Sequence, residues 1–265
     1  MDVTEAAPAC AEYGYVPVTE STRQNLLVPW RGTADAGTTL VCVPWAGAGA
    51  TPFRPWAPLV ASATVHGVRL PGRESRRMEP MPDALEDVVE TLVAELLALD
   101  APRVALFGHC SGALVAFETA RALRRHDKGP DLVRLVVASQ VPPADVAGES
   151  VDADLDPSPY IPDDLREEPE MVELLTPIVT ADMRLVANYV YRPDTPLAVP
   201  LTVLYGGADD RLSRAAVDGW RRETTGPTDV HEIADADHLF GGDSWLALAE
   251  AVATAVDGAG TATKR

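Results

Sequence analysis

A cysteine stands at the centre of a turn whose neighbours are typical of a catalytic nucleophile. Residues 104–117 read VALFGHCSGALVAF, so an apolar segment leads into the pentapeptide GHCSG and an alanine-rich segment follows. A nucleophile elbow, with the pattern G-x-S-x-G, places its reactive side chain on a strained turn between a strand and a helix. Here the middle residue is Cys110, which predicts a thiol nucleophile. The alternative is an ordinary turn with a buried thiol, because free cysteine is among the most buried residue types.

Acids and a histidine follow the cysteine in the chain order nucleophile, acid, histidine that such an elbow requires. The strand predicted over residues 200–205 leads into a loop with two acids, Asp209 and Asp210. Spacing from the glycine pair before them favours Asp210 as the partner of the base, and Asp209 is the alternative. Of the five histidines, His238 alone occupies a loop after a predicted strand with an acid just upstream. We therefore expect His238 to act as the general base.

Two backbone N–H groups are expected to complete this site as an oxyanion hole. One belongs to Ser111, at the N-terminus of the predicted elbow helix, where the helix dipole also favours negative charge. The other is expected from Ala46, in a loop of small residues that lets the backbone approach developing charge. Ser111 itself is not expected to be a shifted nucleophile. Moving the frame by one residue would put His109 and Ala113 where the turn needs glycine.

Apolar segments that predict strands alternate with amphipathic segments that predict helices. This alternation is typical of a mostly parallel sheet that helices cover on both faces. The chain of 265 residues predicts one α/β domain over residues 1–265, with a small, polar and disordered tail at 257–265. The expected strands are 40–43, 64–70, 103–107, 132–138, 200–205 and 228–233, and the expected helices are 83–99, 112–125 and 244–256.

Residues 143–195 interrupt the alternation. This segment is rich in Asp, Glu and Pro, and it holds helical patterns around residues 170–175 and 180–189. It predicts a helical lid inserted between two strands. A long surface insertion without a gating role is the alternative.

Composition excludes several classes of partner. The formal net charge is −18, which argues against nucleic acid and anionic membranes, since both require basic residues. No apolar run approaches the roughly 18 residues that span a bilayer, and the N-terminus lacks the pattern of a signal peptide. Three cysteines without metal-ligand spacing favour a reducing cytoplasm. We expect a cytoplasmic monomer without metal or cofactor.

Four blocks of sequence resemble those of type II thioesterases, the stand-alone editing enzymes of polyketide and nonribosomal peptide assembly lines. Residues 43–47 (VPWAG) are similar to F-P-H-A-G, and residues 70–76 (LPGRESR) to L-P-G-R-E-x-R. Residues 105–113 (ALFGHCSGA) are similar to ALFGHSMGA, and residues 237–240 (DHLF) to the ending G-G-H-F-F. The likeness covers about residues 30–256. Two departures are Trp45 in place of a histidine and Cys110 in place of the nucleophilic serine.

The resemblance implies an α/β-hydrolase fold with a helical lid. Such enzymes cleave acyl or aminoacyl groups from the phosphopantetheine arm of an acyl or peptidyl carrier protein. Because carrier proteins are typically acidic, two arginine clusters are candidate docking surfaces, with Arg73, Arg76, Arg77 and Arg124 as the expected contacts.

The cysteine leaves the acyl acceptor open. A thioester formed on Cys110 exchanges readily with a second thiol, because that exchange is nearly thermoneutral. The sequence therefore allows three functions: a hydrolytic thioesterase, an acyl or aminoacyl transferase or cyclase that uses a thiol or an amine, and a non-catalytic module that binds carrier proteins.

Overall fold

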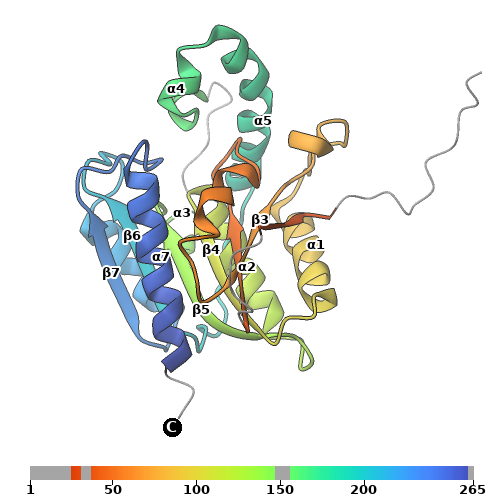
Figure 1. Cartoon of the computed structure of the whole chain (residues 1–265), viewed down its shortest axis with the longest axis vertical. Coiled ribbons are helices and arrows are strands. Elements are labelled where there is room, and N and C mark those ends of the chain that lie inside the picture. The colour runs from red at the N-terminus through yellow and green to blue at the C-terminus, as the bar shows by residue number, and fades with distance from the viewer. Residues whose placement is uncertain (1–24, 31–36, 147–155, 262–265) are drawn as a thin grey trace, which may run out of the picture.

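The computed structural model describes residues 25–30, 37–146 and 156–261, and within them a seven-stranded sheet forms the central layer (Figure 1). Its strand order is β1-β3-β2-β4-β5-β6-β7. Strand β1 is antiparallel to β3, and every other pairing is parallel. The strands are β1 (Leu27–Trp30), β2 (Thr38–Val43), β3 (Thr64–Val68), β4 (Arg103–His109), β5 (Asp131–Ala138), β6 (Leu201–Gly206) and β7 (Thr228–Ile233). The predicted parallel sheet is confirmed.

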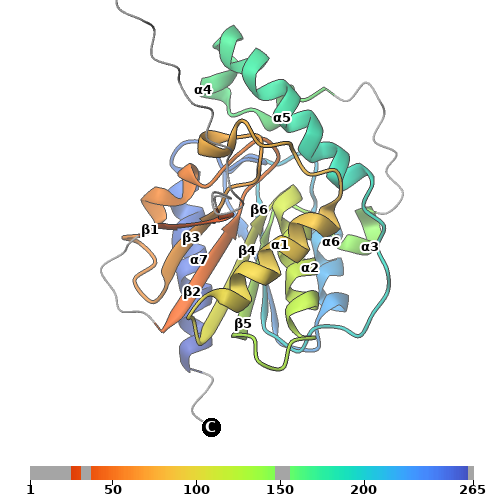
Figure 2. The same ribbon diagram turned by 90° about the vertical axis from the view of Figure 1, so that its right-hand side faces the viewer.

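Helices cover both faces of this sheet (Figure 2). Helices α1 (Leu85–Ala98) and α2 (Ser111–Leu123) lie on one face, and α7 (Ser244–Thr261) lies on the other. Successive side chains of a strand point to opposite faces, so each central strand contributes side chains to a hydrophobic core on either face of the sheet. Val41 and Val43 of β2 belong to the core beneath α1 and α2, while Leu40 and Cys42 belong to the core beneath α7.

The segment between β5 and β6 forms a helical insertion above the carboxyl edge of the strands (Figure 1). Its helices are α3 (Pro143–Val146), α4 (Asp163–Arg166) and α5 (Pro169–Ala187), and residues 147–155 lie outside the described residues. The two predicted helical patterns form one helix, α5, which continues through Pro177. Apolar residues before and after that proline, Leu175 and Val179, pack into the same small core, so packing maintains the helix across it.

The end of the chain departs from the prediction. Helix α7 runs to Thr261, so the disordered tail predicted from residue 257 is wrong for residues 257–261. A helix that is already formed adds residues at little cost, which explains its extension into small residues. Residues 262–265, like Cys10, lie outside the described residues. Among the described helices, none has both the length and the apolar character needed to cross a membrane.

Candidate active site

Cys110 occupies a strained turn between β4 and α2. Its backbone lies at φ 52° and ψ −122°, in a region that residues with a side chain rarely adopt. Two glycines make the turn possible, because a Cβ atom on Gly108 would lie 2.3 Å from the carbonyl oxygen of Gly112. A Cβ atom on Gly112 would lie 2.4 Å from the carbonyl oxygen of Val43. The predicted strand, turn and helix are therefore present, with Cys110 at their centre.

His238 lies between Cys110 and a buried carboxylate. Its Nε2 atom is 3.3 Å from Cys110 Sγ, and its Nδ1 atom is 2.7 Å from Asp209 Oδ2. The three residues come from the loops that follow β7, β4 and β6, all at the carboxyl edge of the sheet. Parallel strands bring such loops together, and ligand sites of open α/β sheets form at this edge.

The acid beside His238 is Asp209, so the preference for Asp210 is wrong. The chain turns immediately after β6, where the amide of Asp209 donates to the carbonyl of Gly206 at 3.3 Å. This turn buries Asp209 and leaves Asp210 exposed. Asp209 Oδ1 also accepts a hydrogen bond from the amide of Arg211 at 3.0 Å, which fixes the carboxylate. The prediction of Asp210 from its spacing to Gly206 and Gly207 required the chain to turn one residue later than it does.

Charge within this cluster favours a protonated imidazole. Burial lowers the pKa of His238, but negative charge on Cys110 and the hydrogen bond to Asp209 outweigh it and raise that pKa to about 10. Burial raises the pKa of Asp209, but the hydrogen bond and charge of His238 lower it below its ordinary value. An imidazolium beside a cysteine stabilises the reactive thiolate. The geometry thus favours a protonated imidazole at His238, in contact with Cys110 Sγ.

This pair predicts a measurable shift in Cys110→Ser. We expect NMR titration of the His238 ring to give a midpoint near 10 in the native chain. In Cys110→Ser the midpoint should fall toward about 6.5, because a neutral hydroxyl supplies no negative charge. Equal midpoints in the two proteins would contradict the effect of Cys110 on the pKa of His238.

The same shift affects stability. Because the folded-state pKa of His238 lies above its unfolded value, the charged ring stabilises the fold most below pH about 6.5. That contribution is lost as the pH rises from about 6.5 toward 10.

His109 supports the loop that carries His238. We did not predict this contact from the sequence. Its Nε2 atom is 2.9 Å from the carbonyl oxygen of His238, to which it donates. Burial lowers the pKa of His109 to about 3, so the ring is neutral. Its ring lies 5.3 Å from that of Trp45 and 5.5 Å from that of Phe240. The position of His109 directly before the nucleophile was the available signal.

The two predicted oxyanion donors come from segments that meet at the elbow. Ser111 begins α2, where the first amides have no partner within the helix. Ala46 is buried in the loop after β2. This loop and the start of α2 lie in close contact, since a Cβ atom on Gly112 would also lie 2.4 Å from the carbonyl oxygen of Pro44.

Two cavities adjoin the cluster. A cleft of about 910 Å³ opens beside His238, and a chamber of about 210 Å³ lies between the loop after β2 and α5. Trp45 and Pro52 line both. The cleft is acidic, with lining aspartates Asp163, Asp164, Asp209, Asp210, Asp235 and Asp237. In the parts of the chain that the structure describes, no group of three or more His, Cys, Asp or Glu is arranged to hold a metal ion.

Two of the predicted docking arginines are buried. Arg73 is 3% exposed and pairs with Asp182, and Arg76 is 6% exposed and pairs with Glu79. The prediction that Arg73 and Arg76 form a docking surface is therefore wrong, because their guanidinium groups serve internal contacts. Arg77 is exposed.

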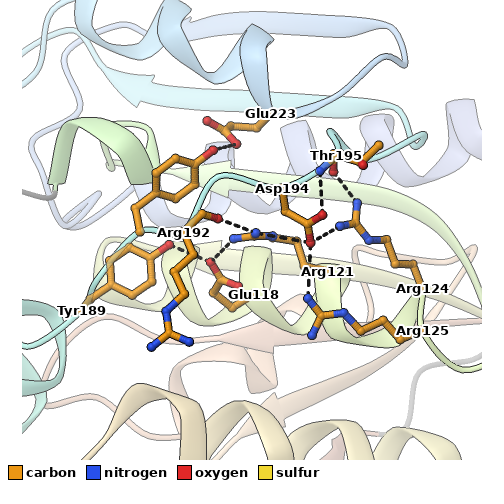
Figure 3. A network of polar contacts seen from close by, with 10 residues as sticks. Glu118, Arg121, Arg124, Arg125, Tyr189, Arg192, Asp194, Thr195 and Glu223 are labelled. Carbon is orange, nitrogen blue, oxygen red and sulfur yellow. Dashed lines mark hydrogen bonds and ion pairs between the residues drawn. The ribbon is translucent and has the colours of Figure 1, made fainter.

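Arg124 belongs to a polar network that ties the end of α2 to the chain leaving α5 (Figure 3). Asp194 pairs with Arg124, with Arg121 at 3.5 Å and with Arg125 at 3.3 Å. A hydrogen bond from the amide of Thr195, together with Arg124 and Arg125, lowers the pKa of Asp194 to about 2. The carboxylate of Asp194, from the same chain, thus offsets part of the positive charge that was predicted to attract a partner.

Comparison with known proteins identifies the class of this fold and site. A family model described as a thioesterase domain matches residues 38–256. The chain belongs to the thioesterase family. The thioesterase PikA5 of Streptomyces venezuelae is 31% identical over 223 residues, which cover 80% of this chain and 78% of PikA5. The AMB antimetabolite synthetase AmbE of Pseudomonas aeruginosa is 32% identical over 79% of this thioesterase, which spans only 10% of AmbE.

Solved structures of thioesterases are similar to this chain over most of its length. The type II thioesterase BorB from the borrelidin biosynthetic cluster superposes with a TM-score of 0.75 at 25% identity, over 88% of this chain and 97% of BorB. YbtT, a type II thioesterase from the yersiniabactin NRPS/PKS pathway, gives 0.68 at 27% identity, over 88% and 99%. The α/β-hydrolase fold is therefore confirmed, and this thioesterase is a thioester hydrolase. The comparisons do not favour the transferase or the binding-module alternative.

Proposed function

We propose that this thioesterase hydrolyses acyl or aminoacyl thioesters on the phosphopantetheine arm of a carrier protein, with Cys110 as nucleophile. His238 is the general base and Asp209 orients it. The observation that carries this proposal is the chain of contacts from Cys110 Sγ through the imidazole to the Asp209 carboxylate. The assembly-line substrate is supported by the biosynthetic clusters from which BorB and YbtT come. Of the predicted docking arginines, Arg77 and Arg124 remain at the surface.

Acylation follows from the geometry of the pair. The Cys110 thiolate attacks the thioester carbonyl, a carbon–sulfur bond forms, and the carbonyl electrons move to oxygen. The amides of Ser111 and Ala46 are the proposed donors to that oxyanion, a role worth about 10²–10³-fold per donor in other enzymes. When the intermediate collapses, the bond to the pantetheine sulfur breaks, and the departing thiol takes the proton from His238.

In deacylation, His238 accepts a proton instead of donating one. The acyl group has neutralised the sulfur of Cys110, so the neutral imidazole can accept a proton from water. The resulting hydroxide attacks the acyl carbon, the free acid forms, and the Cys110 thiolate leaves. The proton remains on His238, which restores the resting ion pair.

Trapping the acyl-enzyme tests the proposal. We expect rapid mixing with an acyl-pantetheine thioester, followed by acid quench and mass spectrometry, to show one acyl adduct on the peptide containing Cys110. Cys42 is an internal control, because it is free but fully buried beneath α7. Free acid should accumulate even when a second thiol or an amine is added. Turnover without an adduct on Cys110 would contradict the assignment.

A further inference from the structure

We propose that the buried ion pair between Arg73 and Asp182 positions the loop after β2 for catalysis by tying it to α5. This inference rests on the function proposed above. It makes Arg73 and Asp182 positioning residues, because they act through the backbone of residues 46–48 and not on the substrate. It also explains why an arginine predicted to dock a partner is buried.

The contacts form a closed network around the loop. Arg73 and Asp182 make a two-pronged pair, with Nη1 to Oδ2 and Nη2 to Oδ1 both at 2.6 Å. Asp182 Oδ2 also accepts the amide of Gly47 at 2.8 Å. Arg73 Nη1 donates to the carbonyl of Ala48 at 2.9 Å. One carboxylate and one guanidinium therefore hold successive backbone groups directly after Ala46, whose amide is a proposed oxyanion donor.

Apolar side chains of α5 pack closely against the same loop. Gly47 lies at φ +88°, and a Cβ atom there would come within 2.4 Å of Val179 Cγ2. Ala46 packs with Val179 and Met183 in a small core between the loop and α5. Asp182 lies on the same stretch of α5 as these two apolar residues, so polar and apolar contacts position the loop together.

The energetics favour a role in orientation over one in bulk stability. Burying two charges carries a large desolvation cost, and a buried pair can often be replaced by apolar residues without loss of stability. The planar guanidinium of Arg73 binds both carboxylate oxygens of Asp182, and this two-point contact fixes the orientation of the two side chains. A displacement of about 1 Å at a catalytic group can cost about 100-fold in rate. The amide of Ala46 is one residue from the anchored amide of Gly47, so a small movement of the loop reaches the proposed oxyanion hole.

The chain offers a matched control for testing this role. Glu79 faces another buried arginine, Arg76, through two hydrogen bonds of 2.7 and 3.0 Å. Asp182→Asn and Glu79→Gln each remove one carboxylate charge from a buried arginine, and Asp182 is the carboxylate that accepts the amide of Gly47 in the loop after β2.

We expect Asp182→Asn to lower kcat for an acyl-pantetheine thioester by about 10- to 100-fold, with KM within about threefold. Glu79→Gln should change kcat by less than about threefold. The rate of Cys110 alkylation by iodoacetamide should be unchanged in both variants, since alkylation develops no oxyanion. Arg73→Lys keeps the charge but lacks the fork, so we expect a smaller loss of kcat from it, and it replaces Asp182→Asn if that variant does not fold.

Two outcomes would overturn the proposal. One is a kcat in Asp182→Asn, or in Arg73→Lys where that variant replaces it, as high as in Glu79→Gln. The other is a loss of alkylation rate in parallel with kcat, because it would indicate general distortion of the site. Failure of the proposed function is separate: it would show as turnover that survives Cys110→Ala, whatever the behaviour of Asp182→Asn.

Discussion

Cys110→Ala is expected to lower kcat for acyl thioesters by about 10⁴-fold or more, with the fold intact. Removing the nucleophile of a triad typically costs this much, because only binding and the oxyanion hole remain to act on the substrate. Cys110 is 6% exposed and its replacement by alanine removes a single sulfur atom, so the main expected change in melting temperature is the loss of its charge contact with His238. Steady-state hydrolysis and thermal unfolding of the same preparation measure the two effects.

Cys110→Ser is the matched variant. It places an oxygen nucleophile at the same point of the elbow, where His238 can accept its proton. We expect turnover well above that of Cys110→Ala, because the strained turn and the donors are unchanged. Wild-type activity in Cys110→Ala would exclude Cys110 as the nucleophile.

Asp209→Asn is expected to lower kcat by about 10³- to 10⁴-fold. A carboxylate beside the base holds the imidazole in the productive tautomer and stabilises the imidazolium, and an amide does neither; the comparable Asp→Asn change in a serine protease costs about 10⁴-fold. The shift in the His238 pKa should diminish too, since the hydrogen bond to Asp209 is one of its causes. Steady-state kinetics and the NMR titration of His238 test both effects.

Asp210→Asn is the control for that experiment. Asp210 is the next residue and lines the same cleft, but it is exposed. The kcat of Asp210→Asn should therefore stay within about threefold of the wild-type value. Equal losses from the two substitutions would show that the acidic cleft, and not the contact of Asp209 with His238, supports catalysis.

The sequence predicted features that depend on local patterning. The strand, the glycine-flanked turn and the helix around Cys110 follow from residue types within one short segment, and the structure places them as expected. His238 was identified because its loop position is a property of the strand and helix around it. The choice between Asp209 and Asp210 depended on how tightly the chain turns after β6. That turn is set by contacts with the loop after β7, such as the hydrogen bond from the Ala208 amide to the Ala236 carbonyl at 2.9 Å.

The burial of charged side chains also could not be predicted from the sequence. Arg73 and Arg76 read as surface cations because their partners were unknown. Asp182 lies more than a hundred positions away, on a helix whose placement over the sheet depends on tertiary packing. Glu79 is near in sequence, but its pairing with Arg76 becomes visible only once the intervening turn is known. Electrostatic predictions from sequence fail where long-range contacts decide which charges meet.

The network around Asp194 has a consequence for building chimeric enzymes. It ties the chain leaving α5 to α2, the helix that follows Cys110. The hydroxyl of Tyr189 donates to Glu118 of α2 at 2.7 Å, which adds a second contact between these segments. Exchange of the helical insertion with that of a relative should therefore join the two chains before residue 189, so that Tyr189, Asp194 and their partners remain native. A junction placed after Asp194 would remove the shared carboxylate and leave three arginines to repel one another. Substrate range could then be varied through α4 and α5, with Asp182 retained opposite Arg73, while the elbow keeps its own support.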